Sequence, residues 1–319
     1  MRLLITGDWH LDTYRPRNRT DDYFQTQFEK VKWIFGLAEE EECEGILQPG
    51  DMFNSHKAND FLKQFYIDYF LYRMTQIDRF PKMDFFTIFG QHDLRFHSSN
   101  KQNTPLRVLE AAHAITIVPN KAIFPTQFRV RHKDHYIYGC NWGEEIPELV
   151  DKDGIHILLM HKLVLEDIEG WEKKYLSVEN VFRFSKHDII VCGDNHISFM
   201  AEKFHKDKQS RLLFNCGSLM RNRIDQRNHK PKVYIVDTSD MSYEEHLIPV
   251  KPFDEVMDVE KAEQEKEKNE QLEAFVEKLS GDVNIEGLDF LRNLEAFMEE
   301  NEIDVPVKEF VEEVLAWEP

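Results

Sequence analysis

Five short groups of polar residues follow strand-like apolar runs along this chain. They read GDWH at residues 7–10, GDMFN at 50–54, GQHD at 90–93, a single histidine at position 161 in LLMHK, and GDNH at 193–196. Aspartate, histidine and amide side chains bind divalent metals, move protons or orient a donor. Because the loops at the carboxyl ends of strands converge in α/β sheets, we expect these groups to meet at one site.

Each group is a weak signal by itself. A lone D-x-H is more often turn chemistry beside a surface histidine, and Gly-Asp after a strand is usually only a tight turn. A histidine in an apolar run, such as His161, is more often a hydrogen-bonded core residue. Five groups in order, each directly after a strand, make chance placement a poor explanation. Since crowded carboxylates repel each other unless cations lie among them, the whole set predicts a metal site.

Hydrophobic periodicity predicts the elements that position these groups. Residues 2–6, 45–48 and 84–89 are typical of short buried strands, and residues 24–40 and 59–78 have helical spacing. This alternation predicts an α/β layered sheet with right-handed crossovers. Later in the chain, further apolar strands recur as AITIV, HYIYGC, IHILLM, HDIIVCG, RLLFNCG and KVYIVDT. Two packed sheets flanked by helices would accommodate all of them.

The charge of the chain is concentrated at its C-terminal end. The net charge of the 319 residues is −19, but residues 251–319 hold 22 acidic and 7 basic side chains. The first 250 residues carry 37 acidic and 33 basic side chains, so this part is not excluded from binding polyanions. Composition therefore predicts a main domain over residues 1–250, an acidic tether over 251–270 and a helical segment over 271–319.

The cysteines and the apolar runs indicate a cellular compartment. Four cysteines are widely scattered, which is typical of reduced thiols. No apolar run reaches the roughly 18–20 residues of a membrane span, and the first residues do not form a signal peptide. We expect a cytoplasmic protein with no membrane partner.

The order of the five groups resembles that of the calcineurin-like metallophosphoesterases, which is D-x-H, G-D, G-N-H-D, H and G-H-x-H. The resemblance covers roughly residues 1–240 and implies a sandwich of two mixed β-sheets flanked by helices. Within this superfamily, residues 94–112 and 215–238 are most similar to the SbcD-type DNA repair exonuclease subunits of bacteria and their phages.

The resemblance implies a site for two divalent metals, whose shared hydroxide attacks phosphorus. The implied ligands of the first metal are Asp8, His10, Asp51 and His196, and those of the second are Asp51, Gln91, His161 and Asp194. The resemblance also implies that His92 lies beside the phosphate as a general acid or electrostatic stabiliser and that Asp93 orients it.

Two of the implied ligands depart from the family pattern. Gln91 stands where the family has Asn, and Asp194 stands where it has His. Gln91 keeps a carbonyl oxygen on a longer side chain, and Asp194 replaces a nitrogen with an anionic oxygen. These harder donors favour Mn²⁺ or Mg²⁺, with Mn²⁺ as our expectation. Either the second metal site is retained, or it is weak and the protein has lost activity.

Basic residues follow the first, third and last groups. A run of charge is usually a solvated face, but the position of these residues beside the metal groups favours contact with phosphates. The candidates for DNA binding are Arg15, Arg17, Arg19, Arg95, His97, Arg221, Arg223, Arg227, Lys230 and Lys232.

Two interpretations of the C-terminal segment are open. Either its three short amphipathic stripes complete a core as packed helices, or they form a docking element for a partner. The resemblance implies docking on the coiled-coil base of an SbcC-like ABC-type ATPase, through helices that follow a tether. It also implies a homodimer, for which residues 59–78 are a candidate, although a core role is the alternative. The interval between Asp237 and Val259 leaves little room for the capping domain of many SbcD proteins.

The sequence therefore predicts a metal-dependent phosphodiesterase that hydrolyses DNA, as the nuclease subunit of an SbcC/SbcD-like repair or recombination complex. One alternative is a phosphoesterase for a small substrate, such as a cyclic nucleotide or a phosphomonoester. The other is a non-catalytic scaffold with a degenerate second metal site.

Overall fold

A computed structural model describes most of the chain outside the C-terminal segment. The described residues are 1–75, 83–95, 101–123, 134–150, 153–166, 176–205, 208–264 and 266–267. The DNA-binding candidate His97 and the helical segment predicted over 271–319 lie outside them. Within the described part, no helix combines the length and the apolar character that crossing a membrane requires.

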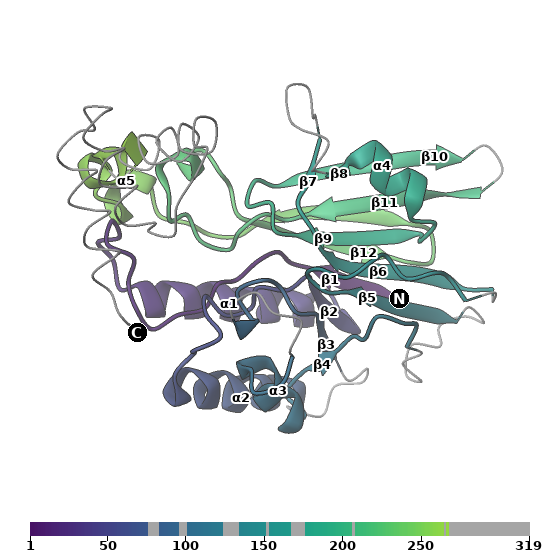
Figure 1. The fold of residues 1–319 in the computed structure, drawn as a ribbon, viewed down its shortest axis with the longest axis horizontal. Helices are drawn as coiled ribbons and strands as arrows, with labels where there is room; N and C mark the ends of the chain where they lie inside the picture. The colour runs from purple at the N-terminus through teal and green to yellow at the C-terminus, as the bar shows by residue number, and fades with distance from the viewer. Residues whose placement is uncertain are drawn as a thin grey trace, which may run out of the picture.

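Two mixed β-sheets stacked face to face form the centre of the molecule (Figure 1). The six strands of the first sheet are, in spatial order, β13 (Ser242–Leu247), β12 (Lys232–Asp237), β1 (Arg2–Ile5), β2 (Gly45–Gln48), β3 (Asp84–Thr87) and β4 (Thr116–Ile117). The five strands of the second sheet are β10 (Phe199–His205), β11 (Lys208–Asn215), β9 (Ile189–Gly193), β6 (Ile155–His161) and β5 (His135–Cys140). A separate pair joins β7 (Val164–Leu165) to β8 (Leu176–Ser177).

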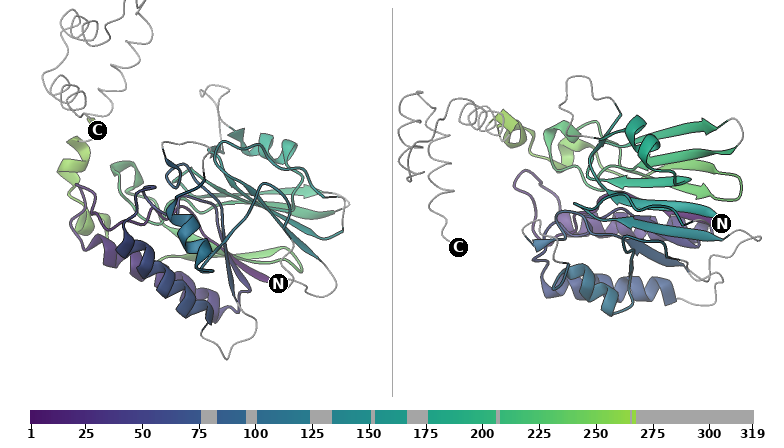
Figure 2. Two further views of the ribbon diagram at one scale, coloured as in Figure 1. Left: turned by 60° about the horizontal axis from the view of Figure 1, so that its bottom comes forward. Right: turned by 45° about the vertical axis from the view of Figure 1, so that its right-hand side comes forward.

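Helices cover the outer faces of both sheets. The helices on the first sheet are α1 (Tyr23–Glu40), α2 (Asp60–Thr75) and α3 (Pro105–Ala111), and α4 (Val178–Phe184) covers the second sheet. Figure 2 shows α1 and α2 side by side, in agreement with the edge-to-face contact between Phe24 and Phe65. A 3₁₀ turn (Ile224–Gln226) and α5 (Phe253–Val256) complete the described elements. The predicted fold class, two mixed sheets flanked by helices, is confirmed.

The period of two in the strands builds three hydrophobic layers. In β1, Leu4 packs among the helices of the first sheet, whereas Leu3 and Ile5 point into the layer between the sheets. In β6, Leu159 joins the same central layer and Leu158 packs on the far side with α4. Because the central strands β1, β2, β6 and β9 are buried on both faces along almost their whole length, the loops at their carboxyl ends have a fixed position.

The sequence located most strands of the two sheets, including the edge strands β4 and β5, but missed the edge strands β10 and β13 and the short pair of β7 and β8. The predicted strand at 45–48 coincides with β2, and the helix expected over 24–40 is α1 with one further residue. The strands β10 and β13 were not predicted. The residues of β13 are almost all exposed, since this strand lies at the sheet edge, and they lack the apolar alternation that marks a strand in sequence.

The beginning of the segment expected to be a tether packs on the domain. Phe253, Val256, Met257 and Ala262 are buried. The backbone N–H of Thr20 donates to the Val256 carbonyl at 3.1 Å. The chain therefore stays attached to the domain beyond residue 251, and the boundary of the tether stays a prediction.

One buried side chain ties the loops of the first sheet together. The amide nitrogen of Gln48 donates to the carbonyls of Gly7, at 3.2 Å, and Gly50. Its amide oxygen accepts from the N–H of Gly50, at 3.1 Å, and from the hydroxyl of Thr87. Gln48 is fully buried, so these four bonds lie away from water.

We predict that Gln48→Leu lowers the free energy of unfolding by about 2–4 kcal/mol, because buried partners that lose their hydrogen bonds cost about 1–3 kcal/mol each. Urea unfolding measures the difference. The matched control is Gln25→Leu, at an exposed position of α1, for which the expected change is within about 0.5 kcal/mol. Equal losses in the two variants would contradict the role of Gln48.

Candidate metal centre

The five polar groups meet at the carboxyl ends of strands from both sheets. In the first sheet, Asp8 and His10 follow β1, Asp51 follows β2, and residues 90–93 follow β3. In the second sheet, His161 ends β6, and residues 194–196 follow β9. The candidate site therefore lies at the seam between the two sheets.

Three of the predicted ligands have a backbone conformation that is rare outside glycine. The φ angles are +46° for His10, +50° for Asp51 and +79° for Asp194. Such left-handed residues cost about 1–3 kcal/mol each and persist only where the surrounding structure determines them. Each of them follows a strand within a few residues, so the chain turns sharply where the side chain enters the site.

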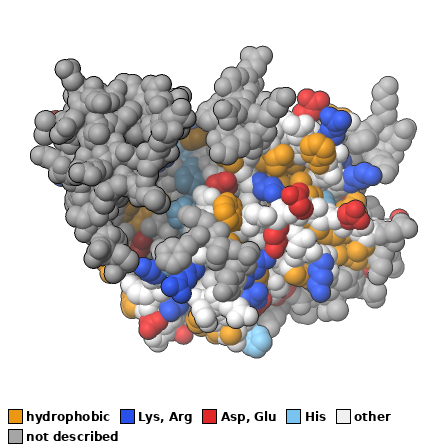
Figure 3. All heavy atoms as spheres, viewed as in Figure 1, with side chains coloured by type: hydrophobic (Ala, Val, Ile, Leu, Met, Phe, Trp, Pro, Cys, Tyr) orange, Lys and Arg blue, Asp and Glu red, His pale blue; other side chains and the backbone are white. Residues whose placement is uncertain are grey.

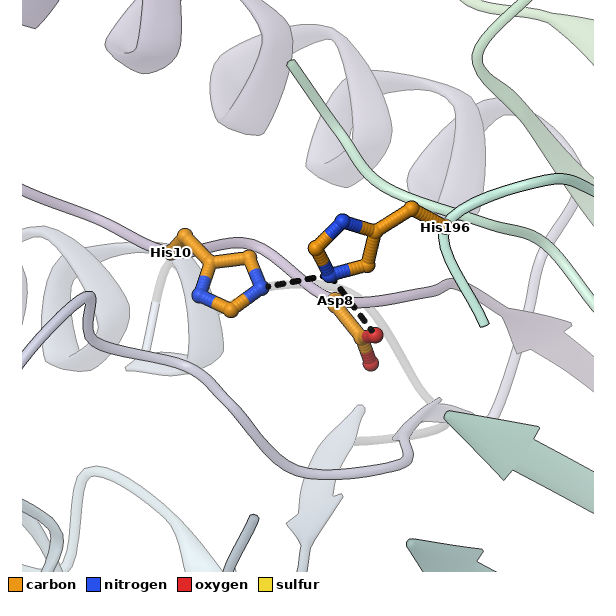
Figure 4. A group of neighbouring side chains, drawn as sticks. All are labelled: Asp8, His10 and His196. Carbon is orange, nitrogen blue, oxygen red and sulfur yellow. Dashed lines mark hydrogen bonds and ion pairs between the residues drawn. The ribbon is translucent and has the colours of Figure 1, made fainter. Parts of the chain in front are cut away.

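The first cluster consists of Asp8, His10 and His196 (Figure 4). The Nε2 atoms of the two imidazoles lie 3.0 Å apart, and His196 Nε2 lies 3.9 Å from Asp8 Oδ2. The N-terminal loop brings Asp8 and His10, and the loop after β9 brings His196 from the other sheet. Two ring nitrogens at this distance either share one proton or face a common cation.

A second cluster forms around Asp51. Its Oδ2 atom lies 3.4 Å from His161 Nε2 and 3.8 Å from His10 Nε2. His161 Nδ1 lies 2.8 Å from the Pro49 carbonyl, which can only accept, so Nδ1 carries the proton. Burial acts to lower the pKa of His161, but the Asp51 carboxylate outweighs it and raises this pKa to about 10, so without a cation Nε2 also carries a proton towards Asp51. A bound cation would replace that proton and use the Nε2 lone pair. Metal-binding histidines commonly have this arrangement, with the distal ring nitrogen bonded to a carbonyl.

The unsatisfied atoms of the two clusters fit divalent cations. Within the described part of the chain, Asp8 Oδ1, Asp51 Oδ2 and His161 Nε2 are buried without a hydrogen-bond partner. Buried polar atoms in proteins are otherwise nearly always paired. Carboxylate oxygens and an imidazole nitrogen are a donor set that Mn²⁺, Mg²⁺ and Zn²⁺ accept.

Burial controls the protonation of these groups. Burial raises the pKa of Asp8 well above its usual range and lowers the pKa of His10 to about 3. Burial also acts to raise the pKa of Asp51, but the neighbouring His161 and His10 outweigh it and hold this pKa below the usual range. Burial raises the pKa of Asp194 and lowers that of His196. A cation would favour the charged acids and neutral imidazoles that act as ligands.

The two ligands that depart from the family pattern contact each other. The amide nitrogen of Gln91 donates to Asp194 Oδ1 at 3.1 Å, and the backbone N–H of Asp194 donates to Asp8 Oδ2 at 2.8 Å. Among the residues described, the acidic and histidine groups whose donor atoms lie within 4.8 Å of one another include neither Asp194 nor His161. The assignment of Gln91, His161 and Asp194 to a second metal stays a prediction.

His92 lies at the mouth of the site, held by a backbone carbonyl. Its Nδ1 lies 3.0 Å from the Asn54 carbonyl, and its ring centroid is 4.8 Å from that of His10. His10, Asp51 and His92 form the second group of closely spaced donor atoms. Asn54 was not among the predicted site residues, because a backbone carbonyl partner leaves no mark in the sequence.

We had expected Asp93 to orient the His92 imidazole, but its carboxylate bonds to backbone groups instead. Its buried carboxylate accepts from the backbone N–H of Gly90 at 3.0 Å and of Phe53 at 3.2 Å. Burial raises its pKa to about 7, and the charge of Asp51 contributes. Asp93 therefore joins the loop that carries His92 to the loop after β2.

A cavity of about 110 Å³ opens beside the clustered ligands. It is lined by Trp9, His10, Asn54, His92, His196, Ser218, Met220, Asn222, Arg223 and Gln226. Figure 3 shows histidine side chains in a hollow of this face, with Lys and Arg side chains gathered below it. From residues 218–226 the sequence analysis named Arg221 and Arg223 but missed Ser218, Met220, Asn222 and Gln226, although the run NCGS ends a strand in glycine as the other groups do.

The segment over residues 218–226 is held by one glutamine. The Gln226 amide oxygen accepts from the N–H of Asn222 at 2.7 Å and of Arg223 at 3.1 Å, and its nitrogen donates to Ser218 Oγ at 2.9 Å. Arg223 is thereby fixed at the cavity rim. Its side chain is 70% exposed and lies 3.5 Å from Asp225.

The other basic candidates are divided between surface and interior. Arg15, Arg17, Arg95, Arg227 and Lys230 are exposed, and Lys232 pairs with Glu245 at 2.8 Å. Arg19 and Arg221 are only 3% and 7% exposed, so they do not lie on an open surface and line a separate cavity instead. Of the candidates that the structure describes, Arg223 is the one that lines the cavity.

Comparison with known proteins agrees with this geometry. Residues 1–198 match the profile of the family described as calcineurin-like phosphoesterase. The chain belongs to this family. Its members are phosphoesterases that typically bind divalent metals, and the closely spaced ligands are consistent with that chemistry. The resemblance predicted from the five groups is confirmed at the level of the family.

Two solved structures are distant relatives in fold. One is described as a novel archaeal phosphodiesterase, with 12% identity over 77% of this chain and 99% of that chain and a TM-score of 0.40. The other is the calcineurin-like phosphoesterase YfkN from Bacillus subtilis, with 10% identity over 84% of this chain and 97% of that chain and a TM-score of 0.44. No curated protein matches the chain.

We predict that Gly90→Ala weakens Mn²⁺ binding by about 10–100-fold, the usual effect of disturbing the surroundings of a metal ligand. A Cβ atom at this position would lie 2.1 Å from Asp51 Oδ1 and 2.4 Å from the Asp51 backbone nitrogen, so Asp51 must move. Calorimetric titration of metal-free protein measures the affinity. The control is Gly36→Ala in α1, where a Cβ has no neighbour within 4 Å. Unchanged affinity in a folded Gly90→Ala protein would contradict the placement of Asp51 at the metal.

Proposed function

We propose that this protein is a metal-dependent phosphodiesterase that hydrolyses DNA, as the nuclease subunit of an SbcC/SbcD-like complex. The observation that carries the phosphodiester chemistry is the convergence of unsatisfied buried ligands beside a cavity lined by His92 and Arg223. The finer assignment to DNA rests on the similarity of residues 94–112 and 215–238 to SbcD-type nucleases.

The residues around the cavity have complementary roles in this proposal. Divalent cations, with Mn²⁺ as our proposal, would polarise a phosphoryl oxygen and activate a water molecule as the nucleophile. Arg223 would bind a non-bridging phosphate oxygen, because a guanidinium matches this group in charge and geometry. Asn54 fixes the Nδ1 side of the His92 ring, so Nε2 is the atom that would donate a proton to the leaving oxygen.

The charge distribution supports a polyanionic substrate. The first 250 residues carry 33 basic and 37 acidic side chains, so they do not exclude a polyanion, and two of the acidic ones, Asp8 and Asp51, are in the candidate metal site. Exposed Arg15, Arg17 and Arg95 would bind the DNA backbone outside the cavity. The ATPase docking by residues 271–319 and the homodimer remain predictions from the resemblance.

We predict that wild-type protein cleaves linear DNA with Mn²⁺ and that Asp51→Ala abolishes this activity, because Asp51 contacts both His10 and His161. Cleavage of duplex DNA, single-stranded DNA, a small diester and a small monoester is compared with Mn²⁺, Mg²⁺ or chelator. Asp68→Ala, at an exposed position of α2, is the control and keeps full activity.

The choice of substrates separates the alternatives. Cleavage of the small ester alone would replace the nuclease by a phosphoesterase for small substrates. If the folded, metal-loaded protein cleaves none of the substrates, either alone or with the ATPase partner, the result would support the alternative of a non-catalytic scaffold.

A second prediction concerns His92. His92→Asn lowers kcat by about 10²–10⁴-fold, the usual contribution of a general acid, and changes Mn²⁺ affinity by less than about threefold. Steady-state kinetics and calorimetry give the two values, with the exposed His113→Asn as control. A large loss of Mn²⁺ affinity would instead make His92 a ligand, beside His10 and Asp51.

A further inference from the structure

A second cavity, of about 200 Å³, lies between α1 and the segments that contain Arg221 and residues 249–256. We call it the Lys30 cavity. Its charged lining residues are Arg19, Glu29, Lys30, Arg221 and Lys251, and the other residues in its wall are Thr26, Trp33, Pro249, Val250 and Val256. None of the five groups of polar residues identified in the sequence contributes to it.

Three of its basic side chains are almost completely buried. The exposed fractions are 3% for Arg19, 6% for Lys30 and 7% for Arg221. Lysine and arginine are rarely buried to this degree unless they are paired with an acid. The pairing of each therefore decides whether the cavity carries a net charge.

Only one of the three has a carboxylate partner among the residues described. Arg19 forms a two-pronged ion pair with Asp21, at 2.9 and 2.6 Å. Lys30 Nζ donates to the Leu219 carbonyl at 2.7 Å, and it forms no ion pair with an acidic side chain of the described residues. Arg221 likewise donates only to backbone carbonyls, those of Lys251 and, at 3.5 Å, Arg227. Two buried cations thus lack a counter-ion.

We propose that the Lys30 cavity binds a phosphate group. A phosphate oxygen would accept from Lys30 Nζ, which uses one of its three N–H groups on Leu219, and from the Arg221 guanidinium. The anion would neutralise two cations that otherwise lie unpaired in a water-poor site. Glu29, the acid in the cavity wall, is on the exposed side of α1 and bonds to Gln25 at 3.2 Å.

The protonation of Lys30 agrees with an absent counter-ion. Burial, together with the charges of Arg19 and Arg221, lowers the pKa of Lys30 to about 7, although Asp21 acts to raise it. A bound anion would raise this pKa again, because an opposite charge favours the protonated amine.

The Lys30 cavity and the metal centre share one segment of chain. Lys30 bonds to the Leu219 carbonyl, and the N–H of Leu219 donates to the Asp8 carbonyl at 2.8 Å. Arg221 lines the Lys30 cavity, whereas Asn222 and Arg223 line the cavity at the metals. The phosphate would come either from a DNA strand bound beyond the cleaved bond or from free phosphate or a nucleotide.

Thermal unfolding of metal-free protein tests the site without relying on activity. Sulfate and phosphate are titrated at constant ionic strength against chloride, at about pH 6, where Lys30 is protonated. We expect a saturable rise in Tm for both oxyanions in wild type. Lys30→Met, which removes the charge and keeps a long side chain, and Arg221→Gln are each expected to weaken the apparent affinity at least about tenfold.

Two controls locate the binding. Lys121→Met, at an exposed lysine outside both cavities, retains the wild-type response, whereas Arg223→Gln removes only oxyanion binding at the metal cavity and keeps the response that Lys30→Met weakens. No saturable response in wild type would overturn the proposal, and so would a response that Arg223→Gln removes and Lys30→Met keeps. Sulfate keeps its charge at higher pH, whereas Lys30 loses its proton. The difference in sulfate affinity between wild type and Lys30→Met is therefore expected to be smaller at about pH 9 than at about pH 6.

DNA kinetics identify the source of the phosphate and rest on the proposed function. If the cavity holds the phosphate of a bound strand, Lys30→Met raises KM for oligonucleotides about tenfold and leaves a small diester unaffected. If it holds free phosphate, Lys30→Met leaves KM unchanged when no phosphate is added and weakens the inhibition of DNA cleavage by added inorganic phosphate. The unfolding experiment measures oxyanion binding directly, so its result would still test the Lys30 cavity if the protein proved not to be a nuclease.

Discussion

The position of Asp51 is the constraint on which the candidate site depends. Its backbone carbonyl accepts from the N–H groups of Trp9, at 3.1 Å, and His10, at 3.0 Å, and its Oδ1 accepts from the His92 N–H at 2.8 Å. One residue therefore joins the loops after three adjacent strands, while its Oδ2 faces His161 from the other sheet. These bonds hold Asp51 in its left-handed conformation, and they leave one oxygen for a cation.

The two departures from the family pattern form a single unit. Taken from the sequence, Gln91 and Asp194 are independent changes at positions about a hundred residues apart. In the fold, the longer amide reaches the shorter carboxylate across the seam at 3.1 Å. The pair therefore has to be considered together when the second metal is assigned.

The sequence predicted the parts of the fold that depend on residue type. Apolar strands ending in Gly-Asp or Gly-Gln-His-Asp located the loops of the site, because buried strands and polar loop residues have a strong signature. Partners made by the backbone had no such signature, so the Asn54 carbonyl behind His92 and the true bonds of Asp93 emerged only from the structure. The burial of Arg19 could not be predicted either, because the sequence does not indicate whether an arginine near a metal-binding motif faces solvent or pairs with a neighbouring acid such as Asp21.

The seam gives the metal centre a mechanical role. Candidate ligands from one sheet face candidate ligands from the other: Asp51 Oδ2 lies 3.4 Å from His161 Nε2, and Asp8 Oδ1 is buried without a hydrogen-bond partner. Cations bound at the seam would cross-link the two β-sheets, which are otherwise held together by apolar packing. Metal supply would then set the lifetime of the protein as well as its rate of turnover, since a molecule stripped of its ions opens more often along the seam and is exposed to proteases.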